Sequence, residues 1–174
     1  MLLVRFLITF VHFFIIGRVD DPLAVHRRRM RVWINDCDIN GHMTNARYPS
    51  FMDLSRLLYF LQVGAWQRFV KEKWLIVLSA QTVTFIKEIK PLALVDIETK
   101  LLCWDKKYFY FEHKFIVDGQ VHAKALARCA AIRGKRVRAF DQFLSVGGYE
   151  VESPEWPEQV IAWQKLMDAK KAAS

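Results

Sequence analysis

The stretch NDCDINGHMTNARYPSFMDLSRLLYFLQ, from Asn35 to Gln62, joins a short polar loop to a long apolar segment. After Asn45 the apolar side chains recur at helical spacing on a wide face, which predicts a largely buried helix. Pro49 is compatible only with the first turn of that helix, so the helix should begin within a few residues of Asn45. Gly64 should end or kink it, and a second short helix is expected to run to about Lys73.

Strands are predicted on both sides of this segment. Before it, RMRVWIN (29–35) alternates apolar and basic or aromatic residues with a period of two. After it come four segments rich in β-branched and aromatic residues. Asp118-Gly119 is a strong two-residue hairpin turn. We expect the four strands to join sequentially in an antiparallel sheet: WLIVLSAQTVTFIKEI (74–89), LVDIETKLLCWDKK (94–107), YFYFEHKFIVDG (108–119) and QVHAKALARCAAIRGK (120–135).

The order of elements predicts an α+β fold in which one long helix packs against one curled antiparallel sheet. Part of such a sheet stays uncovered by a single helix, so pairing with a second subunit is expected. A break at Asp20-Asp21-Pro22 divides an apolar N-terminal segment (1–24) from the main domain (25–145). A C-terminal extension (146–174) should contain a helix that is entered through Pro154 and Pro157.

The N-terminal stretch MLLVRFLITFVHFFIIGR (1–18) is almost wholly apolar, interrupted by Arg5 and His12. It is shorter than the roughly 20 residues of a spanning helix, and no small-residue cleavage site follows it. Three interpretations remain open: a helix or strand packed on the domain or in an oligomer interface, a helix lying in or anchored to a membrane, and a short signal anchor. The basic run 26–29 (HRRR) suits an anionic leaflet, or simply begins a strand as solvated charges.

Composition narrows the class of protein. Of the 174 residues, 53% are hydrophobic and 25% are charged, which favours a packed core over disorder. The formal net charge of +8 favours anionic partners. Cys37, Cys103 and Cys129 are far apart and form no C-x-x-C pair, so neither a disulfide framework nor a metal site is expected. The sequence therefore predicts a cytoplasmic protein with reduced thiols, which the N-terminal segment could associate with a membrane.

The polar loop contains the elements of an acyl-transfer site. A helix that begins beside Asn45 directs free backbone N–H groups and partial positive charge toward an anion or an oxyanion. Gly41 lets the backbone approach a ligand closely. Asp38 is near enough in sequence to act as nucleophile or general base, and Asn40 and His42 could orient water or the carboxylate. The alternative is structural: Asp, Asn and Gly favour turns, and Thr44 or Asn45 could cap the helix.

The segment DCDINGHMTNARY (36–48) resembles the D-x-D-x-x-G-H-x-N-N-x-x-Y signature of hotdog-fold thioesterases. It is similar to the 4-hydroxybenzoyl-CoA thioesterase group and, over DINGHMTN, to plant acyl-carrier-protein thioesterases. The resemblance implies that Asp38 is the catalytic carboxylate, that a backbone N–H near Asn45 polarises the thioester carbonyl, and that Asn40 and His42 line the site. The order of elements over about residues 27–140 fits the hotdog fold, and the general build, with its hydrophobic N-terminal segment, is similar to the thioesterase superfamily member 6 group.

The same resemblance implies a hydrolase of acyl thioesters, on coenzyme A or an acyl carrier protein, that works as a homodimer or homotetramer. It implies no cofactor beyond the coenzyme A of the substrate. The basic stretch RCAAIRGKRVRAF (128–140) would then lie near the mouth of the acyl tunnel and could bind the phosphates of coenzyme A through Arg128, Arg133, Lys135 and Arg136. Alternatively, these charges only protect an edge strand from aggregation. A binding module for nucleic acid is not expected, and a non-catalytic hotdog protein that binds acyl-CoA or acyl carrier protein remains the rival hypothesis.

Overall fold

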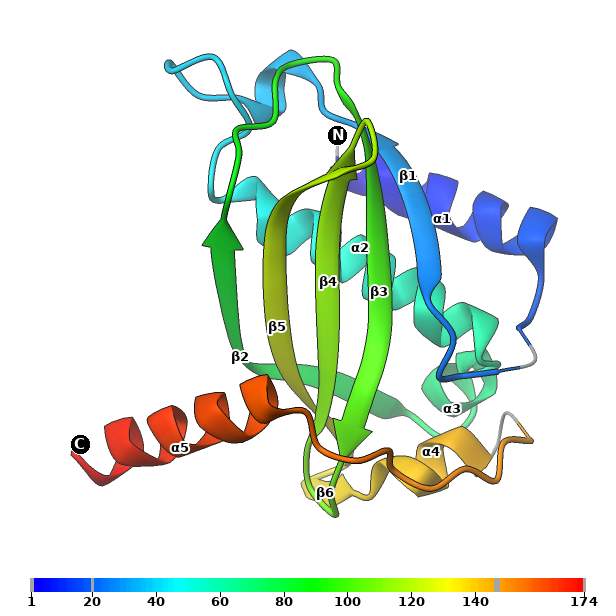
Figure 1. Cartoon of the computed structure of the whole chain (residues 1–174). Coiled ribbons are helices and arrows are strands. Elements are labelled where there is room, and N and C mark those ends of the chain that lie inside the picture. Colours follow the sequence, from blue (N-terminus) through cyan, green and yellow to red (C-terminus); the bar gives the residue numbers. More distant parts are fainter. Residues whose placement is uncertain (1, 20, 146–147, 174) are drawn as a thin grey trace.

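In the computed structural model, which describes residues 2–19, 21–145 and 148–173, a six-stranded antiparallel sheet curls around one long helix (Figure 1). This is the α+β hotdog arrangement predicted from the sequence. Met1 of the predicted N-terminal segment, Asp20 of the predicted break, and residues 146–147 and Ser174 of the predicted C-terminal extension lie outside the described residues. The elements are α1 (Leu2–Ile16), β1 (His26–Arg31), a 3-10 turn (Ile34–Asp36), α2 (Arg47–Gln62), α3 (Trp66–Val70), β2 (Trp74–Phe85), β3 (Leu94–Trp104), β4 (Phe109–Val117), β5 (Gln120–Arg133), β6 (Arg136–Arg138), α4 (Phe140–Ser145) and α5 (Glu158–Ala172).

The strands lie in the order β1-β3-β4-β5-β2, and the short β6 pairs with β5. Sequential pairing is therefore confirmed for β3, β4 and β5 but was wrong for β2, which pairs with β5 at the far edge. The reason lies in the connection after β2. The last residues of this connection are hydrogen-bonded to the residue that follows β1. Val32 donates its N–H to the Ala93 carbonyl, and Leu92 donates its N–H to the Val32 carbonyl. The chain thus crosses from one edge of the sheet to the other before β3 begins (Figure 1).

The long helix α2 has the predicted form. Pro49 lies in its first turn, and the chain leaves it through Gly64, which has a φ of +73°. Eleven of its residues are buried, among them Phe51, Leu58 and Tyr59, which pack against the concave face of the sheet. Burying such side chains stabilises the fold by about 1.5–3 kcal/mol each. The helix therefore forms the centre of the core, and only its N-terminal turn and one flank remain accessible.

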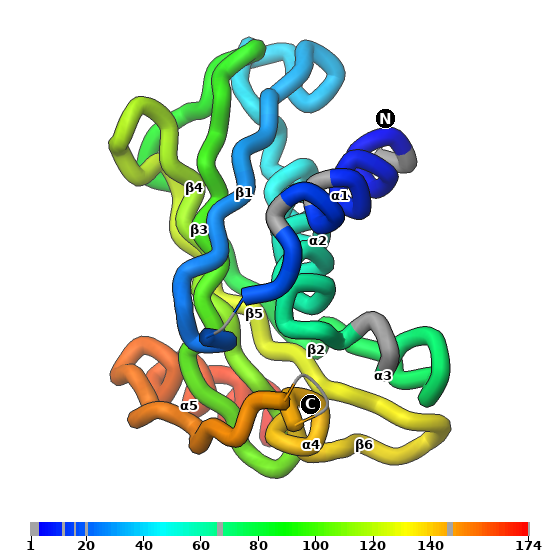
Figure 2. Tube along the Cα trace, turned by 90° about the vertical axis from the view of Figure 1, so that its right-hand side faces the viewer, coloured from blue at the N-terminus to red at the C-terminus, as the bar shows by residue number. Residues whose placement is uncertain are grey.

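The remaining helices cover different faces (Figure 2). α1 packs beside α2 on the concave side, whereas α5 crosses the opposite face of the sheet, where Val160 is fully buried. The sequence did not predict β6 or α4. Within the described ranges, no helix is both long and apolar enough to cross a membrane. α1 nevertheless exposes apolar side chains over much of its length: Val4, Phe6, Leu7, Ile8, Val11, Phe14 and Ile15.

The basic run before the polar loop forms β1, which starts earlier than the sequence suggested and ends at Arg31. Its burial alternates, so Arg28 points inward, where it donates to the Leu54 carbonyl of α2 at 2.8 Å. The outward-facing Arg27 and Arg29 form ion pairs with Glu98 and Asp96 of β3. Arg27, Arg28 and Arg29 therefore all have partners within the fold.

Candidate active site

The polar loop folds as a tight hairpin before α2. Cys37 and Met43 form an isolated antiparallel bridge, and the N–H of Asp38 donates to the His42 carbonyl at 3.0 Å. Gly41 closes the turn with a φ of +73°, a conformation that glycine adopts without strain, and donates to the Asp38 carbonyl at 3.1 Å. The N–H of Met43 is anchored on the Ile89 carbonyl. The hairpin is therefore held at its base and open at its tip.

Asp38 and His42 lie side by side on this hairpin. The Asp38 carboxylate oxygen Oδ1 is 3.8 Å from His42 Nδ1, and both side chains are about one third exposed. The same oxygen accepts the backbone N–H of Asn40 at 2.9 Å, the geometry of an Asx turn. Asn40 is exposed at the tip. Two of the predicted site side chains are thus brought together, whereas Asn40 contributes its backbone.

The N-terminus of α2 has no side-chain cap, so the interpretation of Thr44 or Asn45 as a helix cap was wrong. Thr44 instead donates its N–H to the Asp36 carbonyl and accepts the N–H of Arg47 through its own carbonyl. Within the part of the chain that the structure describes, the N–H groups of Asn45, Ala46 and Tyr48 donate to no other residue. These groups, together with the helix dipole, form a site of positive potential.

A cavity of about 230 Å³ opens in front of this turn. It brings together His42 and Asn45 from the predicted set, but Asp38 and Asn40 do not line it. Tyr48, whose pKa burial raises to about 12, stays protonated there and packs its ring 4.9 Å from that of Phe85. Tyr48 ends the motif and was therefore visible in the sequence. No motif marked the other residues of the lining: Met43, Phe85, Ile86, Lys87 and Glu88.

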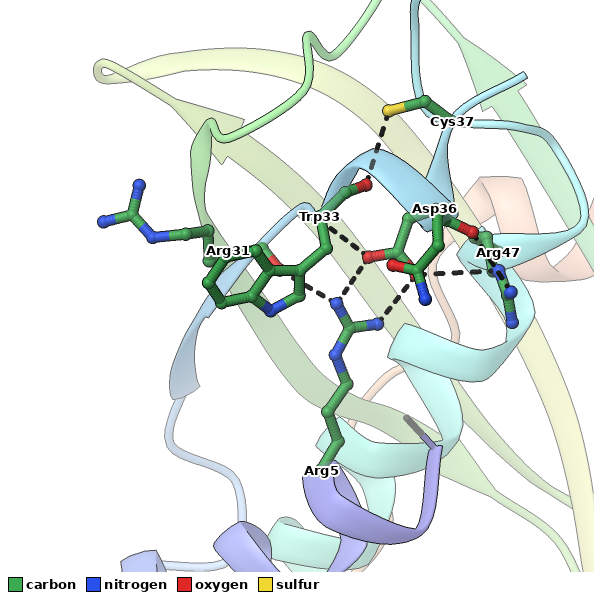
Figure 3. A network of polar contacts seen from close by, with 7 residues as sticks. Arg5, Arg31, Trp33, Asp36, Cys37 and Arg47 are labelled. Atoms are coloured by element: carbon green, nitrogen blue, oxygen red, sulfur yellow. Dashed lines mark hydrogen bonds and ion pairs between the residues drawn. The ribbon is translucent and has the colours of Figure 1, made fainter. Parts of the chain in front are cut away.

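Asp36, the first aspartate of the motif, is only 1% exposed and received no role from the sequence. Burial by itself would raise the pKa of its carboxyl, but the hydrogen bonds from Arg5 and from the Trp33 N–H and the charges of Arg5 and Arg47 outweigh it and lower the pKa. Figure 3 shows Arg5 reaching from α1 into the loop to make this contact. Asp36 is therefore an ionised structural residue directly below the hairpin.

The three cysteines are free thiols and poor candidates for a nucleophile. Burial raises the pKa of Cys103 to about 12 and that of Cys129 to about 11. Burial and the charges of Asp36 and Asp38 also raise the pKa of Cys37, the one cysteine in the loop. Because the thiolate is the reactive form, all three stay unreactive near neutral pH. Among residues 2–19, 21–145 and 148–173, no cluster of His, Cys, Asp and Glu could hold a metal ion.

Of the predicted phosphate-binding residues, Arg133, Lys135 and Arg136 lie at the end of the β5–β2 pair that is remote from the cavity, whereas Arg128 lies midway, beside Ala80. Arg128 donates to Ser79 Oγ at 3.1 Å and stacks over Tyr108, and Arg133 lies 3.6 Å from Glu72. Lys135 and Arg136 are exposed at the β5–β6 turn. β5 pairs with β2 so that Ala123 is beside Phe85 at the cavity, whereas Arg133 is beside Trp74 at the other end. Trp74 and Phe85 are eleven residue steps apart along β2, which is roughly 35 Å if the strand is extended.

Comparison with known proteins adds to this geometry. Residues 32–164 match the family model described as the thioesterase-like superfamily. The chain is 31% identical to protein THEM6 of Xenopus laevis over 153 residues, which cover 87% of this chain and 72% of that protein. A probable thioesterase of Bartonella henselae has the same fold, with a TM-score of 0.61 and 22% identity over 67% of this chain and 98% of that chain. The gentisyl-coenzyme A thioesterase BH1999 gives a TM-score of 0.63 and 21% identity over 71% and 99%.

Proposed function

The chain belongs to the thioesterase-like superfamily, and from this premise we propose that it hydrolyses an acyl thioester, with acyl-coenzyme A as the substrate. The observation that carries the proposal is the cavity at the N-terminus of α2, where His42 and Asn45 meet backbone N–H groups that have no acceptor among the described residues. The activity named for BH1999, whose fold this chain shares, is consistent with a coenzyme A thioester.

The amides at the start of α2 would stabilise the oxyanion. A thioester carbonyl placed in the cavity would accept from the N–H groups of Asn45 and Ala46, and the helix dipole would add to the attraction as negative charge develops. Asn45 lines the cavity, so its amide is in reach of a bound carbonyl oxygen. Removing one such donor typically costs about 10²–10³-fold in kcat.

Asp38 would supply the base or the nucleophile. As a base, it takes a proton from water while the water oxygen bonds to the carbonyl carbon, and collapse of the tetrahedral oxyanion breaks the C–S bond and releases a thiolate that recovers the proton. As a nucleophile, its carboxylate bonds to the carbonyl carbon and displaces the thiolate as the C–S bond breaks, which gives a mixed anhydride. Water then hydrolyses the anhydride to the free acid and the Asp38 carboxylate, and the proton that is released goes to the thiolate. His42, 3.8 Å from the carboxylate and on the cavity wall, would orient the water or the carboxylate, assisted by Asn40.

A second copy of the chain would complete the site, as part of a homodimer or homotetramer. β2 is the edge of the sheet nearest the cavity and exposes Leu75, Val77, Leu78 and Phe85. A long apolar edge strand is a template for pairing with another strand. Pairing about a two-fold axis reverses one β2 against the other, so the Trp74 end of the second copy would approach the Phe85 end of the first.

This arrangement would also give the basic residues their role. Because Arg133 lies beside Trp74, the β5–β6 turn of the second copy would approach the cavity that it cannot reach within its own chain. Its cations would then bind the phosphates of coenzyme A by charge-assisted hydrogen bonds. The residues proposed for this contact are Arg128, Arg133, Lys135 and Arg136. Arg128 is already bound to Ser79, and Lys135 and Arg136 are the most accessible.

One observation favours a second candidate, a non-catalytic protein that binds acyl-CoA or acyl carrier protein. The Asp38 carboxylate accepts the Asn40 N–H as an ordinary turn residue does, and Asp38 does not line the cavity. In that case the hairpin is only a scaffold for the binding pocket. We place either protein in the cytoplasm, with the exposed apolar side of α1 resting on a membrane surface.

Thiol release from short, medium, long and aromatic acyl-CoAs tests the proposal, with wild type and Asp38→Asn compared side by side. Asparagine retains an oxygen that accepts the Asn40 N–H, so the hairpin should survive while the charge is lost. Asp105→Asn is the matched control, because Asp105 accepts the N–H of Lys107 in a similar turn at the other end of the sheet. We expect turnover in wild type and in the control but not in Asp38→Asn. Full activity in Asp38→Asn would contradict the mechanism, and saturable binding without turnover would favour the second candidate.

A further inference from the structure

The N-terminal helix α1 is joined to the polar loop by a buried ion pair between Arg5 and Asp36. Arg5 Nη1 donates to Asp36 Oδ1 at 3.0 Å, and Arg5 Nη2 pairs with Asp36 Oδ2, so the contact is bidentate (Figure 3). The side chains are 11% and 1% exposed. Two further groups hold the same carboxylate: the Trp33 N–H donates to Oδ2 at 2.8 Å, and Arg47 Nε lies 3.6 Å from Oδ1.

Arg5 is itself held in place from several sides. Its guanidinium carbon lies 4.5 Å from the centre of the Phe51 ring of α2, and its Nη2 also donates to the Arg31 carbonyl at the end of β1. The Arg5 carbonyl accepts a hydrogen bond from Arg28, which also binds the Leu54 carbonyl of α2. Arg5 therefore contacts α2, β1 and the loop at once, and its position is set by all three.

Asp36 connects Arg5 to the proposed site through backbone hydrogen bonds. Its backbone carbonyl accepts the N–H of Thr44 at 2.9 Å, and the Thr44 carbonyl accepts the N–H of Arg47 in the first turn of α2. Between these two bonds lie Asn45 and Ala46, whose free N–H groups would stabilise the oxyanion in the proposed mechanism. Any shift of Asp36 must therefore change where these amides point.

We infer that Arg5 is a positioning residue of the site, which it acts on through Asp36. The inference rests on the proposed function, but it concerns a part of the chain outside residues 32–164 that match the family model. Without Arg5, a buried carboxylate loses its main partner, and it must move toward water or become protonated. Thr44, whose N–H is bound to the Asp36 carbonyl, would move with Asp36. A misplacement of the order of 1 Å at a reacting group is enough to cost about 10²-fold in rate.

The test replaces Arg5 by Met, which keeps the stem over Phe51 but removes the charge, and by Lys, which keeps the charge without the fork. Arg29→Met is the matched control, because Arg29 also makes a bidentate pair, with Asp96, at 2.7 and 2.6 Å but on the exposed face of β1. We expect kcat to fall about 10- to 100-fold in Arg5→Met, with KM changed less than about threefold, partial recovery in Arg5→Lys and no change in Arg29→Met. Because the pair is coupled, Arg5→Met should add little to the loss caused by Asp36→Asn.

A second measurement separates the failure of this inference from the failure of the proposed function. Amide ¹H–¹⁵N shifts and hydrogen exchange of Asn45 and Ala46 need no turnover. If Arg5→Met changes these amides and Arg29→Met does not, the positioning role stands even when wild type proves inactive, and only the proposed function falls. If both amides keep their shifts in folded Arg5→Met, or if kcat is retained while only the melting temperature drops, the inference is overturned.

Discussion

Arg56 of α2 donates a hydrogen bond to Nε2 of His113 on β4 at 3.1 Å, and both side chains are buried in the core. Because Nε2 accepts, the ring proton is on Nδ1, which is 2.9 Å from Thr99 Oγ1. Arg56 also forms an ion pair with Asp53, one turn earlier on the helix. This chain of polar groups links α2 to the sheet where the surroundings are otherwise apolar.

Replacing His113 by Leu should destabilise the fold by about 2–3 kcal/mol, because the buried guanidinium loses an acceptor that Leu cannot replace. His113→Gln, which keeps an acceptor near the position of Nε2, should lose about half as much. Urea unfolding at pH 7.5 measures both. Equal stability of His113→Leu and wild type would show that Arg56 is satisfied without the ring.

Stability should fall as the pH drops below about 6.5. Burial and the charge of Arg56 lower the pKa of His113 well below its usual value. Burial also lowers the pKa of His26, although the hydrogen bond that its Nδ1 donates to Gln62 Oε1 and the charge of Asp21 oppose this shift. Below pH 6.5 the unfolded chain therefore binds protons that the folded chain does not, which favours unfolding by up to about 1.4 kcal/mol per pH unit for each histidine.

Urea midpoints between pH 7.5 and 5.5, above the titration range of most carboxylates, measure this dependence. His113→Leu should show a shallower slope than wild type, because the variant lacks one of the two histidines whose pKa is lowered by burial. An identical slope in both proteins would contradict the assignment to His113.

Placing a charge in the middle of β2 should prevent self-association. Val77 is 41% exposed at the sheet edge, and Val77→Lys would place two like charges near each other across a two-fold pair of strands. Light scattering during size exclusion should report an oligomer for wild type and a monomer for the variant, with thioesterase activity lost in parallel. Ile161→Lys, at a similarly exposed apolar residue on α5, is the control and should stay oligomeric.

Reversing the charge at the β5–β6 turn should weaken the binding of coenzyme A. Arg136→Glu is expected to raise KM for an acyl-CoA about tenfold with kcat unchanged, since one charge-assisted contact to phosphate is lost. With the corresponding 3′-dephospho-coenzyme A thioester, wild type and variant should differ much less. Lys165→Glu on α5 controls for the change in net charge. An equal rise in KM in Lys165→Glu would show that the β5–β6 turn does not bind coenzyme A.

The exposed apolar side of α1 should bind lipid. Phe14 is 81% exposed, and Phe14→Glu should abolish co-sedimentation with vesicles that contain anionic lipid. Leu166→Glu, at an exposed apolar residue of α5, should leave co-sedimentation unchanged. If wild type itself stays in the supernatant, α1 is only a packed helix of the domain.

Much of the local structure was predictable because it depends on neighbours in the chain. The apolar period of 3.6 residues identified α2, Pro49 and Gly64 identified its ends, and Asp118-Gly119 forms the expected turn with φ of +49° and +75°. The motif also identified the loop that lines the cavity. Each of these features follows from side-chain spacing or from the backbone conformations of one or two residues.

The choice of partners between distant segments was decided only by the tertiary structure. Alternation predicted strands but could not tell that β2 pairs with β5, because many strand orders satisfy the same pattern. Nor could the sequence show that Arg5 binds Asp36, that Arg56 binds His113, or that the basic turn lies at the far end of the sheet from His42. The sequence alone does not show whether a charged side chain is in water or buried. Only when packing buries it does the cost of desolvation require a specific partner.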